Sequence, residues 1–193
     1  MRQTDLIQIH LPAWLSDFIG HREIITEMRD RMQFVIAASR ENVVQKTGGP
    51  FAAAIFEIES GRLISLGINL VATEKSSILH AEIVAILVAQ KKLGRYKLGE
   101  IGMSQYELVT SSEPCAMCFG AIPWSGVSRV ITGATEADVR AIGFDEGAKV
   151  DDWQAALLAR QIEVVSEVEK DAAATVLKEY TEGGGAIYNG TLN

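Results

Sequence analysis

The segment Thr110-Ser111-Ser112-Glu113-Pro114-Cys115-Ala116-Met117-Cys118 contains both cysteines of the chain, three positions apart. Cysteines at positions i and i+3 of one helical turn can bind the same metal ion, and the dipole of a helix N-terminus stabilises their thiolates. A second segment, His80-Ala81-Glu82, lies at another predicted helix N-terminus and offers His80 as a third ligand. Two cysteines cannot build a disulfide framework, so the pair is either a redox dithiol or part of a metal site.

Short apolar segments on both sides of the cysteines predict a strand-helix-strand unit. Residues 106–110 and 129–133 read as strands, and residues 115–124 between them read as a helix. Two strands that are joined through a helix usually pair in parallel. The cysteine motif therefore begins the helix that connects two parallel strands.

The rest of the chain also alternates between helix and strand patterns. A hairpin is predicted from residues 51–58 and 63–71, because Ser60-Gly61-Arg62 separates two apolar runs. Apolar periodicity and turn residues predict the remaining elements: a short helix near 11–15, helices over 23–44, 79–93, 153–160 and 170–181, and a strand over 162–165. The sum is an α/β sandwich around one mixed sheet of about five strands.

The three candidate ligands fit a catalytic zinc site better than a structural one. Three protein ligands leave a tetrahedral zinc ion one open position for water. Glu82, two residues after His80, can point its carboxylate toward that water and move its proton without binding the metal. A structural zinc would need a fourth ligand, and the only other histidines are His10 and His21 near the N-terminus. A redox pair would make the upstream histidine motif a coincidence.

The two motifs and their surroundings resemble the cytidine deaminase-like superfamily, and most closely the bacterial guanine deaminases. The resemblance covers roughly residues 48–153. Residues 110–124, ending in Trp124, resemble the guanine deaminase form of the cysteine motif, and residues 141–146 resemble its Gly-Phe-Asp-Asp segment with glutamate at the last position. Asn69 and Gly49-Pro50-Phe51 match segments that contact the base. The resemblance implies a three-layered α/β/α sandwich with a mixed five-stranded sheet, a homodimer and one Zn²⁺ per subunit.

The implied reaction is the hydrolysis of guanine to xanthine and ammonia. His80, Cys115 and Cys118 would bind zinc, and zinc-bound hydroxide would attack carbon 2 of the base. Glu82 would carry the proton to the ring, and Glu146 would assist the departure of the amino group. The alternative for Glu146 is a solvated acidic loop residue.

The resemblance also implies a set of substrate-binding residues. Asn69 would hydrogen-bond the lactam edge of the purine, and Phe51 and Trp124 would stack on its two faces. Ala81 and Tyr188 complete the predicted set. Three of these residues have a structural alternative: Asn69 as a turn residue, and Phe51 and Trp124 as core side chains.

Composition and charge indicate a single cytoplasmic domain with a small-molecule substrate. The 193 residues are 48% hydrophobic and 22% charged, which suits one globular core. Residues 1–22 are interpreted as an N-terminal extension and residues 183–193 as a mobile tail that could close the site. The longest apolar run, Ile83 to Ala89, is too short for a membrane span, and the start lacks the layout of a secretory signal. The net charge of −7 disfavours a nucleic-acid partner, because nucleic-acid binders usually neutralise phosphates with Lys and Arg.

Three other functions share parts of these motifs. A tRNA adenosine deaminase has the same zinc motifs but needs a basic surface for RNA, which the acidic composition disfavours. A cytosine or cytidine deaminase uses the same chemistry on a smaller ring, and residues 143–146 favour guanine over both. A non-catalytic protein with a structural zinc would have no use for Glu82.

Overall fold

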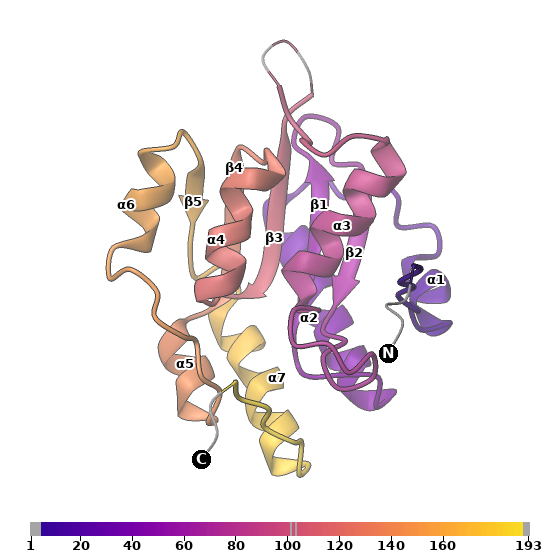
Figure 1. Cartoon of the computed structure of the whole chain (residues 1–193), viewed down its shortest axis with the longest axis vertical. Coiled ribbons are helices and arrows are strands. Elements are labelled where there is room, and N and C mark those ends of the chain that lie inside the picture. Colours follow the sequence, from indigo (N-terminus) through magenta and orange to yellow (C-terminus); the bar gives the residue numbers. More distant parts are fainter. Residues whose placement is uncertain (1–4, 101, 103, 191–193) are drawn as a thin grey trace.

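In residues 5–100, 102 and 104–190, which the computed structural model describes, five strands form one mixed sheet (Figure 1). The strands are β1 (Ala52–Glu57), β2 (Leu63–Ile68), β3 (Tyr106–Ser112), β4 (Arg129–Ala134) and β5 (Glu163–Val165). Their order across the sheet is β2-β1-β3-β4-β5. β1 pairs antiparallel with both β2 and β3, whereas β3, β4 and β5 run parallel. The predicted hairpin and the predicted parallel unit are both confirmed.

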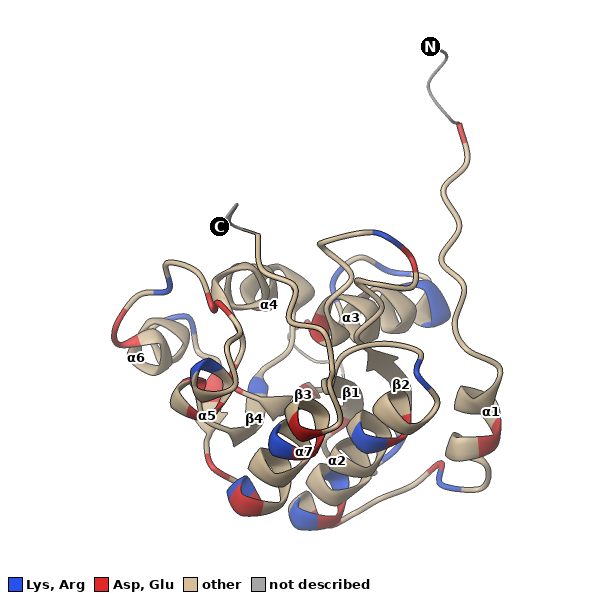
Figure 2. Cartoon of the chain, turned by 90° about the horizontal axis from the view of Figure 1, so that it is seen from below, with Lys and Arg blue, Asp and Glu red and all other residues tan. Residues whose placement is uncertain are grey.

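Helices on both faces make this sheet the middle of three layers. α2 (Met28–Val44) and α7 (Lys170–Glu182) cover one face, and α3 (Ala81–Leu93), α4 (Ala116–Ser125) and α6 (Trp153–Leu158) cover the other (Figure 1 and Figure 2). The predicted three-layered α/β/α sandwich is confirmed. Among the described residues, no helix is both long enough and apolar enough to cross a membrane.

The alternation of side chains along the strands divides the core between the two faces. In β1, Ala52, Ala54 and Phe56 pack in the cluster beneath α2 and α7, and Ala53 and Ile55 pack in the cluster beneath α3, α4 and α6. Successive residues of a strand point to opposite faces, so a strand that is covered on both sides must be apolar at every position. This explains why β1 reads as an uninterrupted apolar run.

Three helices differ from the sequence-based expectation. α2 begins at Met28 and not near residue 23, because Ile24 pairs with Arg62 beside the hairpin and keeps the preceding segment extended. The short helix near the N-terminus, α1, spans Trp14–Ile19 and packs Leu15 into the core. An additional helix, α5 (Glu136–Ala141), follows β4 and begins with a capping box between Thr135 and Asp138.

A buried ion-pair cluster joins α2 to the centre of the sheet. Glu107 in β3 is fully buried, and its two carboxylate oxygens accept hydrogen bonds from Arg31 Nη1 at 2.6 Å and Arg129 Nε at 2.7 Å. Arg31 also donates to the carbonyls of Ile25 and Thr26, which precede α2. Because a buried carboxylate needs full compensation, this cluster fixes α2 against β3 and β4.

Replacing Glu107 with glutamine should destabilise the fold, because two guanidinium groups would lose their counter-charge in the interior. We expect the free energy of unfolding, measured by urea denaturation, to fall by about 3 kcal/mol, as is typical when one partner of a buried pair is removed. The control is Glu179→Gln, which removes an exposed pair with Arg40 and should cost less than about 1 kcal/mol. Equal losses in the two variants would contradict a special role for Glu107.

Candidate active site and metal centre

Two helix N-termini meet at one edge of the sheet and bring the three predicted metal ligands together. His80 is the N-cap residue of α3, Cys115 is the N-cap residue of α4, and Cys118 lies in the first turn of α4. The Sγ atom of Cys115 is 3.5 Å from Nδ1 of His80. The ligand atoms of the three residues all lie within 4.8 Å of one another. This is the spacing that one tetrahedral ion requires.

The donor set of this group suits zinc. A hydrogen bond from Cys118, helped by one from His80, lowers the pKa of the Cys115 thiol to about 4 despite its burial. A thiolate and a neutral imidazole are preferred zinc ligands. Neither His10, which pairs with Glu74, nor the exposed His21 joins the group. Within the described residues the site therefore has three ligands and not the four of a structural zinc.

A cavity of about 390 Å³ opens beside the three ligands. This volume is in the usual range of small-molecule sites. Most of the residues that the sequence singled out lie in its wall: Phe51, Asn69, His80, Glu82, Cys115, Glu146 and Tyr188. The cavity thus brings together segments that are far apart in the chain.

Glu82 lies in the first turn of α3, directly behind His80. Its side chain is buried, and burial together with the negative charge of Cys115 raises the pKa of its carboxyl group. A carboxyl group with a raised pKa beside a metal site can both accept and return a proton. The position of Glu82 in the cavity wall allows it to do so on a bound molecule.

Glu146 reaches the cavity from the loop between α5 and α6. Its backbone carbonyl accepts a hydrogen bond of 2.9 Å from the amide of Ala116, the residue after Cys115. The side chain is 7% exposed, and burial followed by the charge of Cys115 raises its pKa to about 8. Its Oε2 atom has no hydrogen-bond partner among the described residues. A buried oxygen of this kind, facing a cavity, is suited to contact a ligand.

The C-terminal segment returns across the cavity. Asn189 accepts a hydrogen bond from the amide of Asp145 at 2.9 Å and donates one to the carbonyl of Gly143 at 3.1 Å. The Tyr188 ring packs edge-on against Phe144, with 4.9 Å between the centroids, and its hydroxyl lacks a partner in the described part of the chain. Residues 191–193 of the predicted tail lie outside the described residues.

Asn42 is a site residue that the sequence analysis missed. It is fully buried on α2, and its amide donates to the carbonyls of Gly49 at 2.9 Å and Asn69 at 3.0 Å. Gly48 is required at this point, because a Cβ atom there would lie 1.8 Å from the Asn69 carbonyl oxygen. The signal available in the sequence was an asparagine on the buried face of a periodic helix. Asn42 holds the backbone that presents Asn69 to the cavity.

Two residues of the predicted substrate-binding set, Ala81 and Trp124, do not line the cavity. The expected stacking partner of Phe51, Trp124, is 83% exposed and does not line the cavity; Phe51 packs instead against Phe144, with 5.1 Å between the ring centroids. Trp124 lies eight helical positions beyond Ala116, about 12 Å along α4 from the metal ligands. The Ala81 side chain is buried in the core, which leaves only its backbone for contact with a substrate.

Comparison with known proteins agrees with this geometry. The family model for the cytidine and deoxycytidylate deaminase zinc-binding region matches residues 26–134. Guanine deaminase of Bacillus subtilis is 41% identical over 106 residues, which are 55% of this chain and 64% of that protein, slightly under two thirds of its length. The tRNA-specific adenosine deaminase of Bacillus subtilis is 34% identical over 121 residues, or 63% of this chain and 70% of that protein.

Among solved structures, a guanine deaminase from Nitrosomonas europaea superimposes with a TM-score of 0.89 at 42% sequence identity. The match covers 94% of this chain and 100% of that one. The family model spans more than half of the chain, including all three metal ligands. The chain therefore belongs to the family defined by the cytidine and deoxycytidylate deaminase zinc-binding region.

Proposed function

We propose that this protein hydrolyses guanine to xanthine and ammonia. The observation that carries the proposal is the cavity in which the three metal ligands lie beside two buried carboxyl groups, Glu82 and Glu146, whose pKa values are both raised. Hydrolytic deamination needs one group to activate water and another to protonate the leaving amine. The guanine deaminases among the similar proteins support guanine as the base.

The metal-binding group and Glu82 would produce the nucleophile. Zinc held by His80, Cys115 and Cys118 would lower the pKa of water toward neutrality when bound. Glu82 would accept the proton of the attacking water and deliver it to ring nitrogen 3 of guanine. Burial favours this exchange, because it raises the pKa of the Glu82 carboxyl toward the pH at which the protein works.

Glu146 would act on the amino group that leaves. Burial raises the pKa of its carboxyl group to about 8, which favours the protonated form that can donate to an amine. The unpartnered Oε2 atom gives this group a free position for the substrate. Two further similar structures, each 42% identical to this chain, are an asparagine variant and a glutamate variant of one protein with 8-azaguanine bound. Asparagine and glutamate are also the types of the two residues to which we assign these roles: Asn69 would bind the base, and Glu146 would act on the leaving amino group.

The remaining cavity wall would select the base. Asn69 is held by hydrogen bonds through its backbone, and its side-chain oxygen accepts one from the amide of Val71 at 3.2 Å. Its NH₂ group donates to none of the described residues and can contact a purine carbonyl. Phe51 and Phe144 supply an apolar surface for one face of a planar ring. Rings without the matching polar atoms would leave such groups unpaired.

Ammonia release from a panel of bases tests this function. Purified protein should contain one zinc ion per chain and release ammonia from guanine, but not from cytosine, cytidine, adenine or an anticodon stem-loop RNA. The matched control, Glu82→Gln, keeps the size of the side chain and should lower kcat by at least about 100-fold with the zinc retained, because it removes the proton carrier. Turnover of another member of the panel, or full activity of Glu82→Gln, would contradict the proposal.

The C-terminal segment is proposed to be a lid that excludes water from the cavity. Truncation after Gly184 removes Tyr188 and Asn189, whose contacts with the Gly143–Asp145 segment cover the site. We expect kcat for guanine to fall by about 10-fold or more with the zinc content unchanged, since a closing segment orients the substrate and keeps water out. Asn189→Ala, which removes only the two hydrogen bonds, should have a smaller effect. Unchanged kinetics in the truncated protein would contradict the proposal that this segment is a lid.

A homodimer is also proposed, with the exposed side of α4 as part of its interface. Trp124 on this helix is 83% exposed, which is unusual for the largest apolar side chain and typical of association surfaces. Light scattering should give twice the mass of the chain, and Trp124→Ala should weaken the association. A wild-type mass equal to one chain would rule out the dimer. A cytoplasmic location stays a prediction of the sequence.

A further inference from the structure

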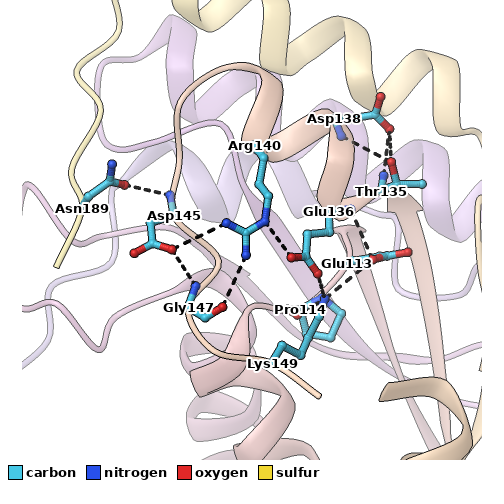
Figure 3. Close-up of polar contacts among 10 residues, drawn as sticks. All are labelled: Glu113, Pro114, Thr135, Glu136, Asp138, Arg140, Asp145, Gly147, Lys149 and Asn189. Atoms are coloured by element: carbon cyan, nitrogen blue, oxygen red, sulfur yellow. Dashed lines mark hydrogen bonds and ion pairs between the residues drawn. The ribbon is translucent and has the colours of Figure 1, made fainter. Parts of the chain in front are cut away.

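Beside the cavity, a lysine is buried among acidic side chains. The Lys149 side chain is 3% exposed, and its Nζ atom lies 2.8 Å from Glu136 Oε2 and 3.6 Å from Glu113 Oε2. Nζ also donates to the carbonyl of Pro114 at 3.1 Å and lies 5.1 Å from the centre of the Trp153 ring. Figure 3 shows Lys149 meeting Glu113, Pro114 and Glu136, which come from separate segments of the chain. A buried ammonium group is costly unless it has acceptors and counter-charge, and here Glu136 and the Pro114 carbonyl lie within hydrogen-bonding distance and Glu113 adds a second carboxylate at 3.6 Å.

The partners of Lys149 belong to the elements that frame the metal site. Glu113 and Pro114 connect β3 to Cys115, and Glu136 begins α5. The amide of Glu136 donates to Glu113 Oε2 at 3.2 Å, so the two acidic residues are also joined to each other. Lys149 therefore ties the end of the Glu146 loop to the segment that leads into the metal-binding helix.

The loop before Lys149 has a defined conformation with Glu146 at its centre. Asp145 accepts a hydrogen bond from the amide of Gly147 at 2.9 Å, and the Glu146 carbonyl accepts one from Ala116 at 2.9 Å. Arg140 holds the outer side of the loop through the carbonyl of Gly147 at 3.3 Å (Figure 3). Arg140 is largely exposed, so its contacts stabilise the loop weakly. The buried contacts of Lys149 are the stronger constraint.

We propose that Lys149 is a positioning residue for Glu146: by binding Glu136, Glu113 and the Pro114 carbonyl, its ammonium group holds the 143–149 loop so that the Glu146 carboxyl stays in the cavity. This inference rests on the proposed function, because Glu146 acts on the substrate there. The positive charge of Lys149 also opposes the rise in the pKa of Glu146 that burial causes. Lys149 does not line the cavity, so it acts through Glu146 and not on the base.

The test compares Lys149→Met, Glu146→Gln and the double variant, all as full-length zinc-loaded protein. Lys149→Met should lower kcat for guanine by about 10- to 100-fold, as expected for a displaced catalytic group, and change KM by less than about 3-fold. In the Glu146→Gln background the same substitution should cause almost no further loss of kcat. A purely structural role of Lys149 would lower kcat by the same factor in both backgrounds, and that result would overturn the proposal.

The matched control is Lys170→Met, which removes an exposed lysine paired with Glu167 and should leave kcat unchanged. Glu136→Gln weakens the same contact from its more exposed side and should lower kcat in the same direction as Lys149→Met. It provides the test if Lys149→Met does not fold. An unaltered kcat in both Lys149→Met and Glu136→Gln would exclude the positioning role.

A second measurement does not depend on the reaction. Hydrogen exchange of the Ala116 and Gly147 amides, which bond to the Glu146 loop, should be faster in Lys149→Met than in the wild type and unchanged in Lys170→Met. Exchange at the wild-type rate would show that Lys149 does not hold the loop. If the wild type released no ammonia from guanine, the proposed function would fail, and exchange would still decide whether Lys149 fixes the loop.

Discussion

Strand β1 runs antiparallel to both of its neighbours, β2 and β3, and this pairing makes β2 and β3 end at the same edge of the sheet. β4 pairs in parallel with β3 and ends there too. The segments that follow these strands supply Asn69 and His80, then Cys115, and then the loop with Glu146. Phe51 joins them because β1 begins at this edge. The strand directions thus place a metal centre and a base-binding wall within one cavity.

The resulting cavity concentrates negative charge in a small buried volume. Cys115 and two carboxyl groups, Glu82 and Glu146, line it, and burial raises the pKa values of both carboxyl groups. A bound zinc ion would compensate the thiolates from inside the site. From outside, Lys149 is the buried cation next to the Glu146 loop, and the Glu113 and Glu136 carboxylates that neutralise it also fix its position. The same contacts therefore compensate the buried ammonium group and fix its position.

Hydrogen bonds from more distant residues complete the positioning of the wall. Trp14 on α1 donates to Thr47 at 3.0 Å, and Thr47 donates to Asn42 at 2.6 Å. Asn42 then holds the carbonyls of Gly49 and Asn69. On the opposite side, the Tyr188 hydroxyl lies so close to Gly49 that a Cβ atom there would be 2.1 Å away. The N-terminal extension and the C-terminal segment thus both contact the Gly48–Gly49 turn or its neighbours.

The sequence by itself determined the sandwich, the β1–β2 hairpin, the parallel pairing of β3 with β4 and the metal ligands, because apolar periodicity, turn residues and the spacing of His80, Cys115 and Cys118 are local properties of the chain. It did not determine which distant side chains meet. Only the tertiary structure showed that Trp124 is exposed and does not line the cavity, that Phe144 lies beside Phe51, and that Asn42 supports Asn69. The partners of Lys149 were equally hidden, since Glu113, Glu136 and Lys149 come together only after β3 and β4 have paired. Contacts of this kind depend on packing, and no local pattern encodes them.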